Sequence, residues 1–175
     1  GKEITNNERG IKRKLSSLRT FYRYFHANRM IDENPTLQVT MPKIHEKNII
    51  RFEPNEAADF LDQVESGARL SKEQQVRHES NKIRDLALTT LLLGTGIRVS
   101  ECVGIDINDI DFSSDRINIV RKGGYESFVY FGDEVRDALL SYLEERKKLI
   151  PKEGHENAFF LSNRLQRISV RNVEV

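Results

Sequence analysis

The stretch LLLGTGIRVSE, residues 91–101, decides the fold because it joins two helical segments through a pair of glycines. Apolar residues before and within it follow helical spacing on a segment too apolar for a surface helix, which predicts a helix through a core. Gly94 and Gly96 predict a tight reversal, because glycine adopts conformations that residues with a Cβ resist. Arg98 and Glu101 then open the second segment. Composition alone favours interpreting these two residues as a buried ion pair.

The residues around that stretch follow a specific order. From the N-terminal side they are Arg84-Asp85, a leucine-rich helix, Thr95-Gly96-Ile97-Arg98-Val99-Ser100-Glu101 and Asp109-Ile110-Asp111. In order and spacing they resemble the first catalytic box of the tyrosine recombinase, or phage integrase, family. In that family the arginine binds the scissile phosphate of DNA. The resemblance therefore implies this catalytic role for Arg98 and a supporting role for Glu101.

Length and composition predict one ordinary hydrophobic core with a small appendage. The chain has 175 residues, of which 38% are hydrophobic and 31% are charged. The sequence has no apolar run long enough to span a bilayer and no signal-peptide pattern at its start, so no membrane partner is expected. The single cysteine, Cys102, excludes an intrachain disulfide and fits a reducing cytoplasm, where we expect the protein to act. We expect Cys102 itself to be buried as a small apolar residue.

Charge is distributed unevenly along the chain. The net charge is only +1, but residues 1–51 hold 11 Lys and Arg against 5 Asp and Glu, a net charge of +6. The remaining residues therefore carry −5. Such asymmetry indicates a basic segment suited to phosphate beside a domain balanced by its own acids.

Residues 8–28 show the spacing of an amphipathic helix. One face of this helix gathers basic residues, among which we select Arg9, Lys12, Arg19 and Arg23 as DNA-binding candidates. A solvated basic face is one interpretation, and contact with the major groove or its phosphates is the other. Both predict exposure, and only the second explains the bias in sign.

The sequence predicts two parts and a linker. Residues 15–35 resemble the end of the family's helical core-binding domain, whose earlier helices are absent. The prediction is residues 1–42 for this remnant, 43–51 for a proline-marked linker and 52–175 for the first part of the catalytic domain. The expected fold class is α+β, mainly α, with a small antiparallel sheet in an incomplete catalytic domain.

Further helices are predicted after the linker. They cover residues 52–65, 71–78, 133–149 and a last segment capped by Ser169. Asp133 is the N-cap candidate of the third helix. His78 has no second histidine or acid at a metal-ligand spacing, so we expect it to be solvent exposed and predict no metal site.

Residues 110–131 change to the period of strands on both sides of Lys122-Gly123-Gly124-Tyr125, which predicts a β-hairpin with a glycine turn. Taken alone, such a lysine is a solubilising loop residue. Residues 119–123 are, however, similar to the family's hairpin, whose lysine reaches the cleaved strand, which implies that Lys122 is the second catalytic residue. The glycine usually before that lysine is Arg121 here. Arg121 is therefore a DNA-binding candidate, and it takes the catalytic position if the register shifts by one residue.

The family reaction proceeds through a covalent 3′-phosphotyrosine, with arginines stabilising charge and lysine acting as general acid. It uses no cofactor, and the sequence shows no phosphate-binding glycine loop. The resemblance also implies a second box, His-x-x-Arg, later along the chain than the first, and a nucleophilic tyrosine, and we expect neither within these 175 residues; Tyr22 and Tyr142 are expected to be core residues. We expect a truncated site-specific recombinase that binds double-stranded DNA weakly without cleaving it, and whose partners are other recombinase protomers on DNA. The alternatives are a non-catalytic DNA-binding module in which Arg98 is structural, and a helical interaction protein without a nucleic-acid partner.

Overall fold

The structure is a computed structural model that describes residues 7–44 and 53–173. The chain divides into two units, Gly1–Arg51 and Phe52–Val175. Most of the predicted linker, residues 45–51, lies outside the described residues.

The first unit is built on helix α1 (Glu8–Ala27), which matches the predicted helix to within one residue. Asn7 caps it, because its side-chain oxygen accepts a hydrogen bond from the backbone N–H of Gly10 at 2.8 Å. A short 3-10 helix, η1 (Pro35–Gln38), follows the turn after α1.

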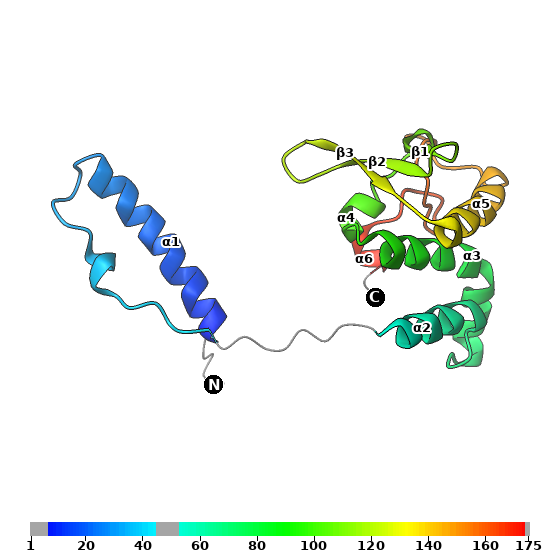
Figure 1. Cartoon of the computed structure of the whole chain (residues 1–175), viewed down its shortest axis with the longest axis horizontal. Helices are drawn as coiled ribbons and strands as arrows, with labels where there is room; N and C mark the ends of the chain where they lie inside the picture. The colour runs from blue at the N-terminus through cyan, green and yellow to red at the C-terminus, as the bar shows by residue number, and fades with distance from the viewer. Residues whose placement is uncertain (1–6, 45–52, 174–175) are drawn as a thin grey trace. The chain divides into compact units, whose positions relative to one another are not determined.

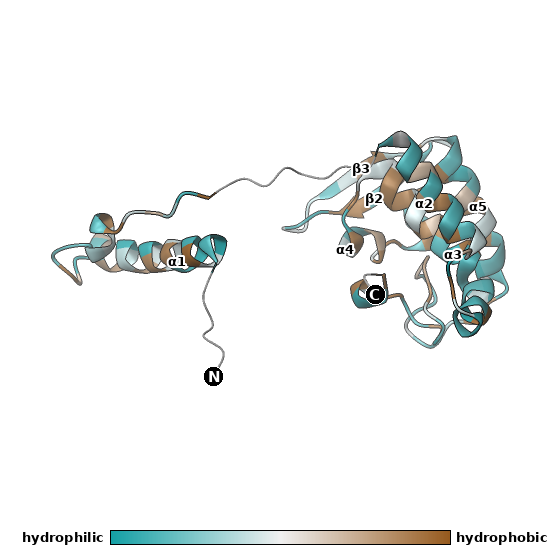
Figure 2. Ribbon diagram, turned by 90° about the horizontal axis from the view of Figure 1, so that it is seen from below, coloured by the Kyte–Doolittle hydropathy of each residue, from teal (hydrophilic) through white to brown (hydrophobic). Residues whose placement is uncertain are grey.

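None of the residues of α1 is fully buried within this unit. Along its apolar stripe, marked by hydropathy in Figure 2, Leu18 is 48% exposed and Phe21 is 54% exposed. Tyr22 is only half-buried, so its prediction as a core residue is wrong. The reason is that η1 is the one element that covers α1 within the described part of this unit, and it is four residues long.

The second unit combines helices with a small antiparallel sheet (Figure 1). Its elements are α2 (Pro54–Ser66), α3 (Lys72–Thr95), α4 (Val99–Cys102), η2 (Ile107–Asp109), β1 (Ile110–Asp111), β2 (Arg116–Val120), β3 (Glu126–Tyr130), α5 (Asp133–Lys147) and α6 (Val170–Val173). The strands lie in the order β1-β2-β3, and the predicted hairpin is β2–β3, with Ile117 opposite Val129. The predicted fold class, α+β and mainly α, is confirmed.

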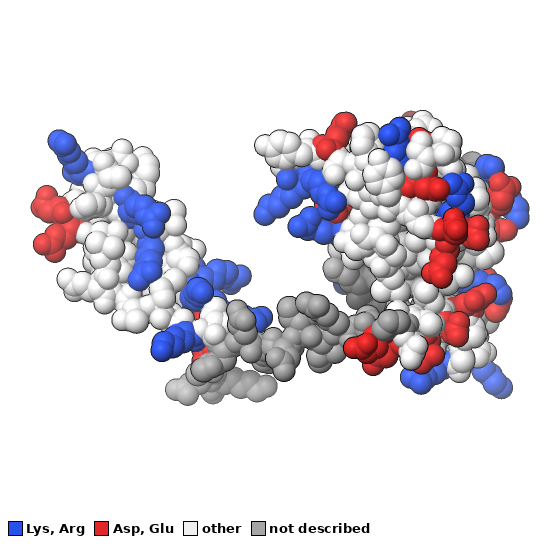
Figure 3. Space-filling view, viewed as in Figure 1, with Lys and Arg blue, Asp and Glu red and all other residues white. Residues whose placement is uncertain are grey.

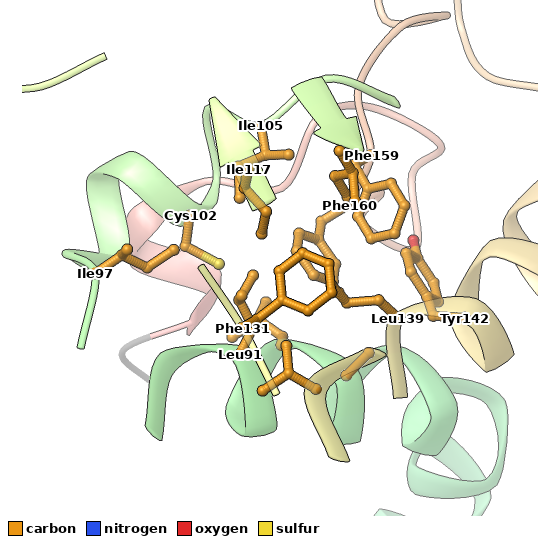
Figure 4. Packing of buried hydrophobic residues seen from close by; sticks show 14 of the residues in the cluster. Leu91, Ile97, Cys102, Ile105, Ile117, Phe131, Leu139, Tyr142, Phe159 and Phe160 are labelled. Carbon is orange, nitrogen blue, oxygen red and sulfur yellow. The ribbon is translucent and has the colours of Figure 1, made fainter. Parts of the chain in front are cut away.

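A single core lies between α3, α5 and the sheet (Figure 4). It contains Leu91 of α3, Leu139 and Tyr142 of α5, Ile117 and Ile119 of β2, and Phe159 and Phe160 of the segment after α5. Each large apolar side chain buried in this way contributes about 1.5–3 kcal/mol. Tyr142 is 3% exposed, as predicted, and its hydroxyl oxygen accepts a hydrogen bond from the N–H of Leu161 at 3.0 Å.

Helix α3 is longer than predicted. The expected short helix at residues 71–78 and the apolar core helix are one continuous helix of 24 residues, which starts at a capping box formed by Ser71 and Gln74. His78 is half-buried, with its Nε2 2.6 Å from the carbonyl oxygen of Val64, so its predicted solvent exposure is wrong. The reason is that α2 packs along α3 and Gly67, at the end of α2, lies against the His78 ring.

The two glycines before Arg98 have different roles. Gly96 is the C-cap of α3, with a left-handed φ of 65° and its N–H donating to the carbonyl oxygen of Leu92 at 3.0 Å. Gly94 remains inside the helix, and a Cβ added there would lie 2.6 Å from Cγ2 of Val135. The prediction that both glycines make the reversal is therefore wrong for Gly94, which instead permits close packing of α3 and α5.

Two helix ends complete the comparison with the sequence predictions. The N-cap of α5 is Gly132, and Asp133 is its first helical residue, so the predicted cap is off by one position. The side chain of Ser169 does cap the short helix α6, because its Oγ accepts from the N–H of Asn172 at 3.4 Å. In the described ranges 7–44 and 53–173, no helix combines the length and apolar composition that a bilayer span requires.

Candidate functional site

The site begins where α4 starts. Arg98 is the N-cap residue of this helix, and Glu101 is the third residue after it. The Oε2 of Glu101 accepts from the backbone N–H of Arg98 at 2.9 Å, and Oε1 accepts from its Nη1 at 3.0 Å. The carboxylate thus holds both ends of the same arginine and fixes its direction.

Burial differs sharply between these two partners. The side chain of Glu101 is 4% exposed, whereas that of Arg98 is 67% exposed. The prediction of an ion pair is confirmed, but only its acidic member is buried. An exposed guanidinium held by a buried acid can still use its outward N–H groups to bind an anion such as phosphate.

A second arginine reaches the same carboxylate from the hairpin. Nη1 of Arg121 lies 3.3 Å from Oε2 of Glu101, and the Arg121 side chain is 38% exposed. Arg98 and Arg121 are therefore brought together by one buried acid. The sequence does not indicate this contact, because the two partners belong to different elements and no local pattern links them.

The charge of Glu101 follows from these contacts. Burial raises the pKa of its carboxyl, but hydrogen bonds from Arg98 and the positive charges of Arg121 and Arg98 outweigh burial and hold the pKa below its ordinary value. Glu101 is therefore ionised at neutral pH. Two arginines against one carboxylate leave the cluster with a net positive charge.

Lys122 lies in the exposed turn of the hairpin, directly after Arg121. Two glycines with positive φ follow it, Gly123 at 99° and Gly124 at 82°, as the predicted glycine turn requires. Lys and Arg side chains gather beside the β2–β3 hairpin and α4 in Figure 3. Lys122 is thus the next residue along the chain after Arg121, which contacts Glu101.

The basic candidates of α1 do not all have the same environment. Arg9, Lys12 and Arg23 are exposed. Arg19 is half-buried, and its Nη2 donates to the carbonyl oxygen of Val39 at 2.6 Å. Arg19 therefore ties α1 to the segment after η1, which the sequence did not indicate.

A further arginine, Arg167, contacts the backbone directly after α4. Nη1 of Arg167 lies within hydrogen-bond distance of the carbonyl oxygens of Val103, Gly104 and Ile105, at 3.1, 2.9 and 3.1 Å, and its Nη2 pairs with Asp106. These carbonyls follow the end of α4, where unpaired acceptors and the helix dipole favour a cation. Arg167 was not among the predicted site residues, because its position just before a predicted helix carries no signal for this contact.

Cys102 follows Glu101 on α4 and points into the core. It is fully buried, as predicted, and burial raises the pKa of its thiol to about 12. The thiol is therefore protonated at neutral pH and cannot act as a nucleophile there.

Comparison with known proteins identifies the family. The profile of the phage integrase family matches residues 51–175. The chain is similar to the tyrosine recombinase XerC of Caldanaerobacter subterraneus subsp. tengcongensis, at 33% identity over 175 residues, covering 98% of this chain and 44% of that protein. It is also similar to XerC of Oceanobacillus iheyensis, at 35% identity over 171 residues, covering 95% and 52%. The chain thus spans about half the length of the curated relatives it matches.

Two solved structures share the fold. One is the Tn1549 transposon integrase in complex with transposon right end DNA, with a TM-score of 0.72 and 20% identity, covering 96% of this chain and 56% of that one. The other is a lambda integrase dimer bound to a core site, with a TM-score of 0.64 and 17% identity, covering 95% and 55%. From the family profile, the relatives and the fold together, this chain belongs to the phage integrase family of tyrosine recombinases.

Proposed function

We propose that this chain is part of a site-specific DNA recombinase and that Arg98 binds the phosphate at the cleavage site. One observation carries the proposal: Arg98 is fixed by the buried Glu101 while 67% of its side chain stays exposed. Only Nη1 of the guanidinium is bound by Glu101, so its other N–H groups are available to an anion. A guanidinium suits the task because its planar N–H groups match the oxygens of a phosphate.

In the proposed reaction, a tyrosine hydroxyl gives up its proton to water, its oxygen attacks the phosphorus, and the bond from phosphorus to the 5′ oxygen of the next nucleotide breaks. Arg98 stabilises the negative charge that develops on the non-bridging oxygens. Lys122 donates a proton to the leaving 5′ oxygen, which completes formation of the 3′-phosphotyrosine. The reaction needs neither a metal ion nor a nucleotide, so we propose no cofactor.

The one His-x-x-Arg string among these 175 residues, His26-Ala27-Asn28-Arg29, precedes Arg98 and is therefore not in the position of a second box, and we assign no tyrosine of the chain as the nucleophile. We therefore propose that the chain by itself binds double-stranded DNA and does not cleave it. Residues 1–42 and 52–175 would correspond to the end of a core-binding domain and to the first part of a catalytic domain. Arg9, Lys12 and Arg23 would contact the DNA backbone, whereas Arg19 is partly committed to Val39. Other recombinase protomers are the proposed protein partners on DNA.

The test compares DNA binding by the wild-type chain and by Arg98→Gln. Glutamine keeps a donor for Glu101 but removes the positive charge. We expect weaker binding to a fluorescent duplex and a salt dependence whose log–log slope falls by about 0.9, the value for one lost phosphate contact. Arg69→Gln removes an equally positive, exposed side chain between α2 and α3 and serves as the control.

Three results would count against parts of the proposal. If Arg98→Gln binds DNA as the wild type does, Arg98 has no phosphate role. If the Arg98→Gln variant loses binding because its lower melting temperature leaves it partly unfolded in the assay, Arg98 is structural and the chain is a non-catalytic DNA-binding module. A covalent adduct between this chain and a nicked duplex, detected on a denaturing gel, would show that the proposed inability to cleave is wrong.

A further inference from the structure

We infer that Arg121 is a positioning residue: through Glu101 it holds the base of the β2–β3 turn on α4 and thereby places Lys122 beside Arg98. This inference rests on the proposed function, since it concerns the same phosphate site. It assigns to Arg121 a role different from direct contact with DNA.

The carboxylate of Glu101 is shared by Arg98 and Arg121. Oε1 accepts from Nη1 of Arg98 at 3.0 Å, while Oε2 lies 2.9 Å from the backbone N of Arg98 and 3.3 Å from Nη1 of Arg121. At 4% exposure this carboxylate has almost no access to water, so protein donors must replace its hydration. Arg121 is therefore a partner that the buried acid requires, and the acid in turn fixes Arg121.

Arg121 lies at the base of the hairpin turn, directly after the last paired residue of β2. The strand pairing ends at Val120 opposite Glu126. Beyond it, the N–H of Arg121 donates to the carbonyl oxygen of Tyr125 at 2.7 Å, and the N–H of Gly124 donates to the carbonyl oxygen of Arg121 at 3.0 Å. The backbone of Arg121 thus closes the turn that contains Lys122, while its side chain reaches α4.

Without the contact between Arg121 and Glu101, little would restrain the turn that contains Lys122. Lys122, Gly123 and Gly124 are all exposed, and the two glycines have positive φ. A glycine-rich turn at the end of a two-strand ladder restrains its side chains weakly. A tether from residue 121 to a buried acid limits where the ammonium of Lys122 can move.

The experiment uses Arg121→Gln and a matched control, Arg116→Gln. Arg116 begins β2, the strand that ends one residue before Arg121; its side chain is also 38% exposed, and it pairs with a different acid, Asp111, at 3.2 Å. Both variants remove one positive charge from the β2–β3 hairpin, but only one removes a partner of Glu101. Affinity for a fluorescent duplex is measured at one salt concentration, and thermal melting is recorded to establish that each variant is folded.

Two double-mutant cycles then test the mechanism. We expect Arg121→Gln to weaken DNA binding roughly three- to tenfold, and Arg116→Gln to have a smaller effect. In a Glu101→Gln background, Arg121→Gln should cost no more affinity than Arg116→Gln does. The loss caused by Lys122→Gln should also be smaller in the Arg121→Gln background than in the wild type. A role in fold stability alone would lower the melting temperature and leave the effects of residues 121 and 122 on affinity independent.

The outcomes separate this inference from the proposed function. If Arg98→Gln and Lys122→Gln weaken binding but Arg121→Gln costs the same factor in every background, Arg121 contacts DNA directly and the positioning role is wrong. If Arg121→Gln and Arg116→Gln have equal effects, Arg121 has no special role. If Arg98→Gln and Lys122→Gln both bind as the wild type does, the proposed phosphate site itself fails, and the inference fails with it.

Discussion

Gly94 in α3 lies so close to Val135 in α5 that a Cβ on the glycine would be 2.6 Å from Cγ2 of the valine. This approach fixes the end of α3 against α5, two residues before the cap at Gly96 and four before Arg98. The position of the arginine therefore depends on a helix–helix contact that lies outside the site.

Gly94→Ala should destabilise the protein by about 1–3 kcal/mol through overpacking. The sign is informative, because alanine in a helix is otherwise favoured over glycine by about 1 kcal/mol. Urea denaturation would measure the change. With Val135→Ala in the background the overlap is relieved, so Gly94→Ala should become neutral or stabilising. Gly96→Ala is the control: its cost arises from a φ of 65° and should be the same in both backgrounds.

Glu101→Gln should lower the free energy of unfolding at neutral pH by about 1–3 kcal/mol, because it weakens hydrogen bonds between charged groups. Burial raises the pKa of Glu101, but its arginine partners bring the folded-state pKa below the ordinary 4.5. The ionised carboxylate therefore stabilises the fold fully above about pH 4.5, and this contribution is lost as the pH falls through the folded-state pKa. The difference between wild type and variant should shrink on acidification. A difference that stays constant down to acid unfolding would contradict the assignment.

Cys102 should not react with a thiol reagent in the native protein at neutral pH. Burial raises its pKa to about 12, so the reactive thiolate is scarce, and the side chain is inaccessible. Labelling by iodoacetamide, followed by mass spectrometry, should proceed only when urea unfolds the protein. Rapid modification of the folded chain would show that α4 opens readily.

Arg146→Met should destabilise the protein by about 1–3 kcal/mol, because it leaves buried acceptors without donors. Arg146 is 4% exposed, its Nε donates to the carbonyl oxygen of Ala158 at 3.0 Å, and its Nη2 donates to that of Glu156 at 2.8 Å. Lys147→Met, next along α5, removes an exposed ion pair with Glu144 and should change stability by less than about 0.5 kcal/mol. Equal effects of the two substitutions in chemical denaturation would refute the role given to Arg146.

Several elements were predictable because their signals are local. The bounds of α1, the helix start near Ser71, the glycine turn of the hairpin and the burial of Cys102 each depend on residues within a few positions of one another. Errors arose where a neighbouring element decides the environment. Tyr22 is half-buried because little covers α1 in its unit, and His78 is half-buried because α2 packs beside α3.

The sequence by itself determined most helices and the hairpin, the resemblance to the family and the pairing of Arg98 with Glu101. Each of these depends on the spacing of residues within a single segment of the chain. Only the tertiary structure decided that Arg98 stays open while its acid is buried, that Arg121 shares this acid from 20 residues away, and that Gly94 serves packing and not the turn. The physical reason is that exposure and contacts between elements depend on how helices and strands pack together, and no local pattern of residues records that packing.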